Sequence, residues 1–233
     1  MGCFLCPQVR FELLAQENRI LGQWLPGGIL FQSLFIGILY RENCMDAQIT
    51  ELVRKYAITM VSQSRYEHSL RVAETAEKLC QLHGLNPQRG YFAGIAHDIC
   101  KEMKGELIIS LATLDGEPVG KLEQDKPGLL HGRAAASVLK NNFSVEDEDI
   151  LEAVRLHTFG APGMGDLAKV LYVADKVEPG RSHVTEAYLE RLFAMGLDEA
   201  MRFVLKENID FLRERGKKIA PASLKLLSFV EGQ

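Results

Sequence analysis

From residue 46 onward, hydrophobic side chains recur at spacings of three and four residues, and runs of alternating or β-branched residues are scarce. This periodicity is typical of helices that bury one face. It predicts an all-α protein with helices over residues 46–60, 64–83, 87–101, 105–114, 130–141, 146–158, 165–177, 185–195 and 198–215. Gly84 and the segment 160–163, GAPG, supply stops between helices. Ser144 followed by Asp147 predicts a variant capping box.

The first 44 residues follow a different pattern. Residues 25–40, LPGGILFQSLFIGILY, are mostly apolar but too short for a membrane span, which needs about 18 residues or more. No secretion signal is predicted, because Glu12 and Glu17 precede this run. We therefore expect an extension of undecided status over 1–44, a helical domain over 45–215 and a tail over 216–233 that packs on the domain. One hypothesis is that the working protein begins at Met45, which the intact mass of protein made from the native gene would test.

Composition narrows the class of protein. A chain of 233 residues with 47% hydrophobic and 25% charged residues can form one main domain with a small attachment. The net charge of -4 argues against a general nucleic-acid binder but leaves room for a local basic pocket that holds phosphates. The five cysteines form no zinc pattern, and Cys80 and Cys100 lie in helical stretches, so we expect a reduced, cytoplasmic protein. No interface signal is visible, and a homodimer is left open.

Several ionisable side chains continue the apolar stripes of separate predicted helices. They are His68, His131, His157 and Asp175, and the pair His97-Asp98 lies in the apolar stretch YFAGIAHDICKEM at 91–103. Burial of one such group without a partner costs about 2–7 kcal/mol. A single histidine is more often satisfied by a backbone carbonyl, but several imidazoles and carboxylates pointing into one interior are the ligands that transition metals prefer. The pattern therefore predicts a metal site in the core.

The spacing around His97-Asp98 suggests what else is bound there. Neighbouring residues on a helix diverge by about 100°, so these two side chains can hold one ion from two sides. Gly94 leaves room one turn before Asp98, and Lys101 lies three residues after Asp98 on the same side. A lysine at this place has little use beside a purely structural metal, but it suits a phosphate that the metal also holds.

With its pattern of H, HD and D at 68, 97/98 and 175, the chain resembles the HD-domain superfamily of metal-dependent phosphohydrolases. Five segments resemble more narrowly the YqeK family, the bacterial symmetrical bis(5'-nucleosyl)-tetraphosphatases: EHSLRVAETAEKL at 67–79, AGIAHDICK at 93–101, LLHGRAAA at 129–136, AVRLHTFGAPGM at 153–164 and VADKVEPGR at 173–181. The likeness covers about residues 46–215. The leucines that this family usually has around HD are replaced by Ile95, Ala96 and Ile99.

This resemblance implies an HD-domain helical bundle that cleaves diadenosine tetraphosphate symmetrically to two ADP. It implies iron, as one or two ions, held by His68, His97, Asp98 and Asp175, with manganese or another divalent metal as alternatives. It places His131 and His157 at a second metal position or at the phosphates. The residues expected to contact the nucleotide are His68, Asp98, Ile99, Cys100, Lys101, His131, His157, Asp175, Lys176 and Arg181; those expected to take part in catalysis are Asp98, Lys101, His131 and His157.

Other interpretations of the same pattern remain open. A different HD phosphohydrolase would act on guanosine polyphosphates, deoxynucleotides or cyclic dinucleotides, although no GYP-type segment follows the HD pair as cyclic-dinucleotide enzymes would require. A non-catalytic nucleotide-sensing or RNA-binding module is the third interpretation, and the presence of every candidate ligand argues against it. The number and identity of the metal ions are left open.

Overall fold

The computed structural model describes residues 47–232, and in this range helices are the only regular secondary structure, which confirms the all-α prediction. The helices are α3 (Ala47–Met60), α4 (Gln63–Leu82), α5 (Pro87–Ala96), α6 (Gly105–Ala112), α7 (Lys121–Asp125), α8 (His131–Phe143), α9 (Glu148–Leu156), α10 (Asp166–Val177), α11 (Glu186–Phe193), α12 (Leu197–Glu214) and α13 (Pro221–Glu231), with short 3-10 turns η1 (Thr113–Asp115) and η2 (Pro127–Leu130). The extension over 1–44 and the start at Met45 lie outside the described residues. Within them, no helix has the length and apolar character needed to cross a membrane.

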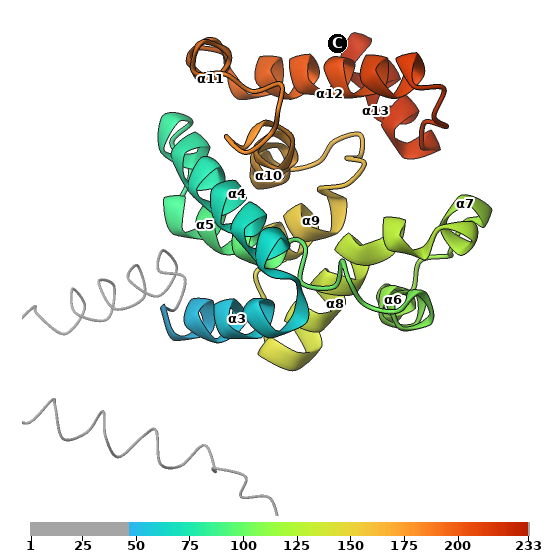
Figure 1. Cartoon of the computed structure of the whole chain (residues 1–233). Helices are drawn as coiled ribbons and strands as arrows, with labels where there is room; N and C mark the ends of the chain where they lie inside the picture. Colours follow the sequence, from blue (N-terminus) through green and yellow to red (C-terminus); the bar gives the residue numbers. More distant parts are fainter. Residues whose placement is uncertain (1–46, 233) are drawn as a thin grey trace, which may run out of the picture. The chain divides into compact units, whose positions relative to one another are not determined.

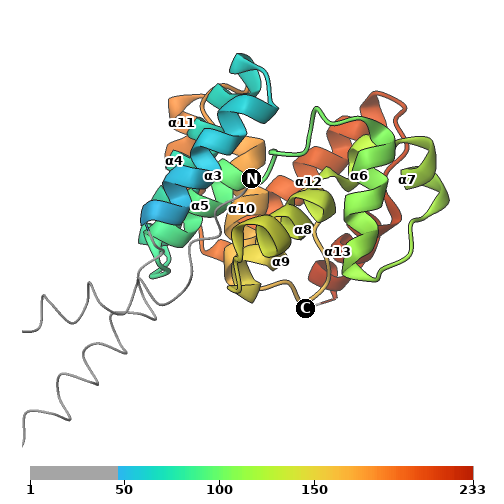
Figure 2. The ribbon, with the colours of Figure 1, turned by 90° about the horizontal axis from the view of Figure 1, so that it is seen from below.

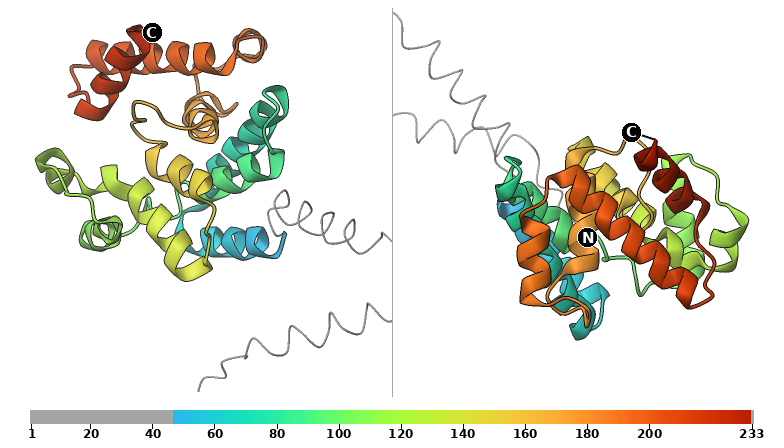
Figure 3. Two further views of the ribbon diagram at one scale, coloured as in Figure 1. Left: turned by 180° about the vertical axis from the view of Figure 1, so that it is seen from behind. Right: turned by 90° about the horizontal axis from the view of Figure 1, so that it is seen from above.

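Helix α10 lies at the centre of the described part of the chain. It contacts α4, α5 and α9 on one side and α12 on the other. Figures 1 and 3 show α11, α12 and α13 gathered beyond α10, away from α3 and α8. Figure 2 shows α6 and α7 on one side of α8 and α9, with α3, α4 and α5 on the other. The arrangement surrounds α10 with apolar neighbours, so that most of its side chains are buried.

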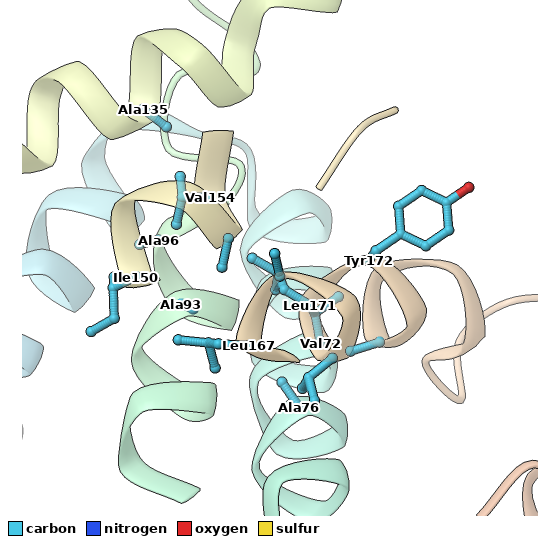
Figure 4. Packing of buried hydrophobic residues seen from close by; sticks show 14 of the residues in the cluster. Val72, Ala76, Ala93, Ala96, Ala135, Ile150, Val154, Leu167, Leu171 and Tyr172 are labelled. Carbon is cyan, nitrogen blue, oxygen red and sulfur yellow. The ribbon is translucent and has the colours of Figure 1, made fainter. Parts of the chain in front are cut away.

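The hydrophobic core forms where these helices meet. Val72 of α4, Ala93 of α5, Ile150 of α9 and Leu171 of α10 are fully buried and lie together in Figure 4. They occupy the apolar stripes predicted from the periodicity, because burial of apolar surface is what sets the orientation of each helix. The ionisable residues that continue these stripes are therefore carried into the interior as well.

Glycines allow two helix pairs to approach unusually closely. A Cβ atom on Gly94 of α5 would lie 2.4 Å from Cα of Ala73 in α4, and one on Gly90 would lie 2.6 Å from Sγ of Cys80. Likewise a Cβ on Gly132 of α8 would lie 2.8 Å from the carbonyl oxygen of Val154 in α9. Each of the two helix pairs, α4 with α5 and α8 with α9, has candidate site residues near its glycine contact. The glycines therefore determine how closely those residues approach one another.

Two local predictions were wrong. The helix predicted over 87–101 ends at Ala96, and residues after it form tight turns with i to i−3 bonds such as Lys101 N to Asp98 O at 2.9 Å. Ser144 does not begin a capping box: it closes α8 in a left-handed conformation with φ of 53°. Asp147 alone caps α9, where it accepts from the backbone N–H groups of Asp149 and Ile150.

The C-terminal region contains a helix that periodicity did not predict. In α13, Pro221 occupies the first turn, which suits its missing N–H group, and Leu226 and Val230 are buried one turn apart. The Ser223 hydroxyl donates to the carbonyl of Phe159 at 3.1 Å. The domain limits at residues 44 and 215 stay a prediction.

Candidate metal and nucleotide site

Six ionisable side chains from separate parts of the chain meet at one buried place. His68 comes from α4, His97 and Asp98 from the turn after α5, His131 from the first turn of α8, His157 from the residue after α9, and Asp175 from the last turn of α10. The first five are at most 6% exposed, and the side chain of Asp175 is 16% exposed. The structure thus brings together all the histidines and aspartates that the sequence analysis assigned to the site.

The candidate ligand atoms fall into two overlapping groups. His68, His97 and Asp175 form one group and His97, Asp98 and His157 the other, with the ligand atoms of each group within 4.8 Å of one another. His97 Nε2 lies 3.6 Å from Asp98 Oδ2 and 3.8 Å from Asp175 Oδ1, so this atom belongs to both groups. The four ligands expected from the resemblance therefore lie around His97.

Three of the four histidines have the same orientation. The Nδ1 atoms of His97, His131 and His157 lie 2.6–2.7 Å from the carbonyl oxygens of Gly94, Gly128 and Val154, three residues earlier in each case. A carbonyl only accepts, so each Nδ1 carries a proton, and in the neutral form of each ring the lone pair of Nε2 faces the site. These Nε2 atoms are the ones available to a metal.

This arrangement leaves acceptor atoms facing one another. His131 Nε2 lies 2.9 Å from both His157 Nε2 and Asp98 Oδ1, contacts in which lone pairs of neutral rings would oppose one another, and the Lys101 ammonium 3.1 Å from His131 Nε2 is the cation beside them. His97 Nε2 and Asp98 Oδ1 are buried without a hydrogen-bond partner. Buried polar atoms that lack partners are costly, and imidazole and carboxylate donors suit divalent transition metals. The residues present therefore fit a metal ion.

The protonation states also suit a metal. Burial lowers the pKa of His97 and holds the pKa of His157 well below its usual value. Burial raises the pKa of Asp98 and of Asp175, but hydrogen bonds and positive charge from their neighbours, among them Lys101 and Lys176, outweigh it and hold each pKa well below the usual range. Neutral imidazoles and ionised carboxylates are the forms that bind metals, and the lowered pKa values of His97, His157, Asp98 and Asp175 favour these forms.

Cationic side chains border the cluster. Lys101 Nζ lies 3.1 Å from His131 Nε2 and 3.8 Å from Asp98 Oδ1, and Arg181 Nη2 donates to Asp175 Oδ1 at 3.0 Å. The Lys101 and Arg181 side chains are 31% and 38% exposed, so both can reach an anion in solvent. Lys176 lies deeper, where its Nζ donates to the carbonyl of His157 at 2.9 Å, and burial lowers its pKa.

The remaining residues expected to contact the nucleotide, Ile99 and Cys100, have only main-chain groups available for such a contact. Ile99 and Cys100 are at most 1% exposed, and their side chains belong to the hydrophobic core. Their peptide groups lie in the turns between Asp98 and Lys101. Any contact of these two residues with a nucleotide would therefore use the main chain.

Sequence reasoning missed two residues at the site. Arg65 Nη1 donates to Asp98 Oδ2 at 3.0 Å, and its side chain is 34% exposed. Glu178 is 2% exposed and lies 3.1 Å from Nδ1 of His68 through its Oε1. Spacing offered a signal for both, because Arg65 precedes His68 by three residues and Glu178 follows Asp175 by three. That signal was not decisive, since charged residues at such spacings are common on solvated faces.

Comparison with known proteins places the chain among HD-domain proteins. The HD domain family matches residues 65–180. The chain is 32% identical to a symmetrical bis(5'-nucleosyl)-tetraphosphatase of Bacillus subtilis over 72% of this chain and 92% of that protein. A second one, from Halalkalibacterium halodurans, is also 32% identical, over 70% of this chain and 87% of that protein. A crystal structure of a predicted HD superfamily hydrolase involved in NAD metabolism, from Clostridium acetobutylicum, superposes with a TM-score of 0.72 at 29% identity, over 78% of this chain and 96% of that one.

Proposed function

We propose that this chain, which belongs to the HD-domain family of symmetrical bis(5'-nucleosyl)-tetraphosphatases, is a metal-dependent hydrolase that cleaves diadenosine tetraphosphate into two ADP. The observation that carries the proposal is the buried cluster in which His97 Nε2 is shared by two candidate metal groups. A cluster of this kind bordered by cations suits a polyphosphate substrate better than it suits a structural ion.

We assign the metal to His68, His97, Asp98 and Asp175, with His131 and His157 at a second metal position or at the phosphates. Iron is the proposed metal because the family resemblance implies it. The same ligand atoms would also bind manganese or another divalent ion. When bound, such a metal supplies Lewis-acid chemistry, because it lowers the pKa of a coordinated water towards about 7 and polarises a phosphoryl oxygen.

The chain's own residues bind and orient the substrate. Lys101, Arg65 and Arg181 each hold a site carboxylate at the rim of the cluster, and each is exposed enough to turn towards a phosphate. Their positive charges offset the charge that develops on the leaving diphosphate, an effect that is strong in a buried site. Whichever of His131 and His157 holds no metal first takes up a proton from a water molecule at Nε2 and then donates it to the leaving oxygen. The deep burial of the imidazoles keeps bulk water away from the reacting groups.

Metal content and product analysis on one preparation test the proposal. The purified protein is assayed with diadenosine tetraphosphate, guanosine tetraphosphate and dATP, and the products are separated by anion-exchange chromatography. ADP as the sole product from diadenosine tetraphosphate, in a protein that contains metal, supports the proposal. Formation of ATP and AMP, hydrolysis of only the other two nucleotides, or tight binding without turnover would each refute it in favour of asymmetric cleavage, another HD hydrolase or a nucleotide sensor.

We also propose a cytoplasmic location, which is supported by the free, buried thiols of Cys80 and Cys100. A small nucleotide is the proposed partner, without nucleic acid or membrane. The homodimer stays a prediction that sedimentation of the purified chain would test.

A further inference from the structure

We infer that Glu178 is a positioning residue that makes His68 a metal ligand by setting the tautomer of its ring. This inference rests on the proposed metal-dependent function and concerns one ligand of the site. His68 differs from the other three histidines, because its Nδ1 faces the Glu178 carboxylate and not a backbone carbonyl. Of the four site histidines, His68 is thus the one whose tautomer a side-chain substitution can change.

Both carboxylate oxygens of Glu178 act as acceptors. Oε1 lies 3.1 Å from His68 Nδ1 and accepts from Arg71 Nη2 at a longer 3.5 Å, while Oε2 accepts from Arg71 Nε at 2.5 Å and from the backbone N–H of Gly180 at 2.6 Å. Arg71 and Gly180 can only donate at these atoms, so Glu178 accepts from both sides. An ionised carboxylate cannot donate, so the His68 ring must donate from Nδ1 to Glu178.

The opposite edge of the same ring faces the site. His68 Nε2 lies 3.2 Å from Asp175 Oδ1, a second carboxylate, so a metal ion held by Asp175 would displace any proton from Nε2 and bind its lone pair. Metal-ligating histidines commonly donate their other N–H to a carboxylate, and this contact orients the ring and makes the ligand more basic. Glu178 occupies that position for His68. Burial of Glu178 to 2% exposure keeps water from competing for the same bond.

The carboxylate also holds the loop that delivers Arg181. Besides the Gly180 N–H, Arg181 Nε lies 3.7 Å from Glu178 Oε1, and Arg181 reaches Asp175. Gly180 itself has no room for a side chain, because a Cβ there would lie 2.5 Å from Nε of Arg71. Glu178 thus joins α4 to the loop after α10 at the point where two proposed ligands meet.

The variant Glu178→Gln distinguishes control of the His68 tautomer from a role of the Glu178 side chain in packing alone. Glutamine has nearly the same shape but offers one acceptor oxygen and one NH2 group. The two donors Arg71 and Gly180 will take the oxygen, so the NH2 group faces His68 Nδ1. The ring must then accept at Nδ1 and carry its proton on Nε2, which removes the lone pair from the site.

The experiment uses full-length protein stripped of metal. Histidine-selective 15N NMR reads the tautomer of His68, with the signal assigned by comparison with His68→Gln, and titration with Fe(II) or Mn(II) under anaerobic conditions gives the dissociation constant. Glu67→Gln is the matched control, because Glu67 precedes His68 in α4, is exposed, and accepts a hydrogen bond from Gln63 at 2.9 Å on the outer face of that helix. Thermal unfolding of each apo-protein monitors the fold.

The expected result is a proton on Nδ1 of His68 in the wild type and in Glu67→Gln, alone or with a second proton on Nε2 shared with Asp175. In Glu178→Gln we expect the Nε2-H tautomer and metal binding weakened by about 10–100-fold. An unchanged tautomer in Glu178→Gln overturns the inference, even if stability or metal affinity falls, because that is what a packing role would give. If this variant fails to fold, an Nε2-H tautomer in the wild type would equally overturn it. A wild type that binds no metal refutes the proposed function instead, while its tautomer still decides the role of Glu178.

Discussion

Replacement of Gly94 by alanine tests whether the close approach of α4 and α5 holds the site together. The added Cβ would lie 2.4 Å from Cα and 2.6 Å from the backbone nitrogen of Ala73. Carbon atoms in ordinary contact are about 3.5–4.0 Å apart, so the helices must separate by about 1 Å. Backbone is in contact with backbone here, and no flexible side chain can move away to relieve the overlap.

The expected change in the free energy of unfolding of Gly94→Ala is the sum of two opposing effects. Overpacking of this kind costs about 1–3 kcal/mol. Alanine recovers up to about 1 kcal/mol because it favours the helix over glycine. We therefore expect Gly94→Ala to lower the free energy of unfolding by about 1–2 kcal/mol. His97 follows α5 directly and His68 lies on α4, so the same shift spoils a ligand geometry that tolerates only about 0.2 Å, and metal affinity should fall at least tenfold.

Gly128→Ala is a closely matched control. The carbonyl of Gly128 accepts from His131 Nδ1 at 2.6 Å, just as the carbonyl of Gly94 accepts from His97 Nδ1 at 2.7 Å. A Cβ at Gly128 meets nothing within 4 Å, and its φ is not positive. This variant should stay within about 0.5 kcal/mol of the wild type.

Urea unfolding followed by circular dichroism and metal titration of the apo-proteins provide the two readouts. If Gly94→Ala matched the wild type in both, the α4–α5 contact would not determine the geometry of the site. Equal damage from Gly128→Ala would show that the hydrogen-bonding carbonyl, and not the helix approach, is the sensitive feature.

Further variants probe the metal, the substrate and the fold. Asp98→Ala should lose both bound metal and turnover, whereas Asp210→Ala, which removes an exposed carboxylate with 63% side-chain exposure, should keep both; elemental analysis and product chromatography measure this. Arg65→Gln should reduce kcat/KM by about 10²-fold with metal content unchanged, and loss of metal in this variant would contradict a role at the phosphates. Asp115→Asn breaks the paired bonds to Arg133, at 2.7 Å each, and should cost about 1–3 kcal/mol at pH 7. Burial raises the pKa of Asp115 but Arg133 lowers it further, so this stability is present above the unfolded pKa of about 3.9 and is lost as pH falls through the folded pKa. Urea unfolding at pH 7 and at pH 3 should thus show a smaller difference between Asp115→Asn and wild type at pH 3 than at pH 7.

Some features of this protein are determined by local sequence. The spacing of apolar residues predicts the helices and shows which face of each is buried, because burial depends on the position of a residue around its own helix. For this reason the helical periodicity alone assigns His68, His131 and Asp175 to the interior. The HD pair and the segments around it also suffice to place the chain in its family.

Other features depend on which buried faces meet. Arg65 contacts Asp98 33 residues away, and Glu178 contacts His68 110 residues away, so no local pattern identifies these partners. The sharing of His97 by two groups depends on the end of α5 at Ala96 and on the approach of α5 to α4 at Gly94. Helical periodicity gives the direction of a side chain, but distances of a few ångströms between ligand atoms arise only from the packing of helices against one another.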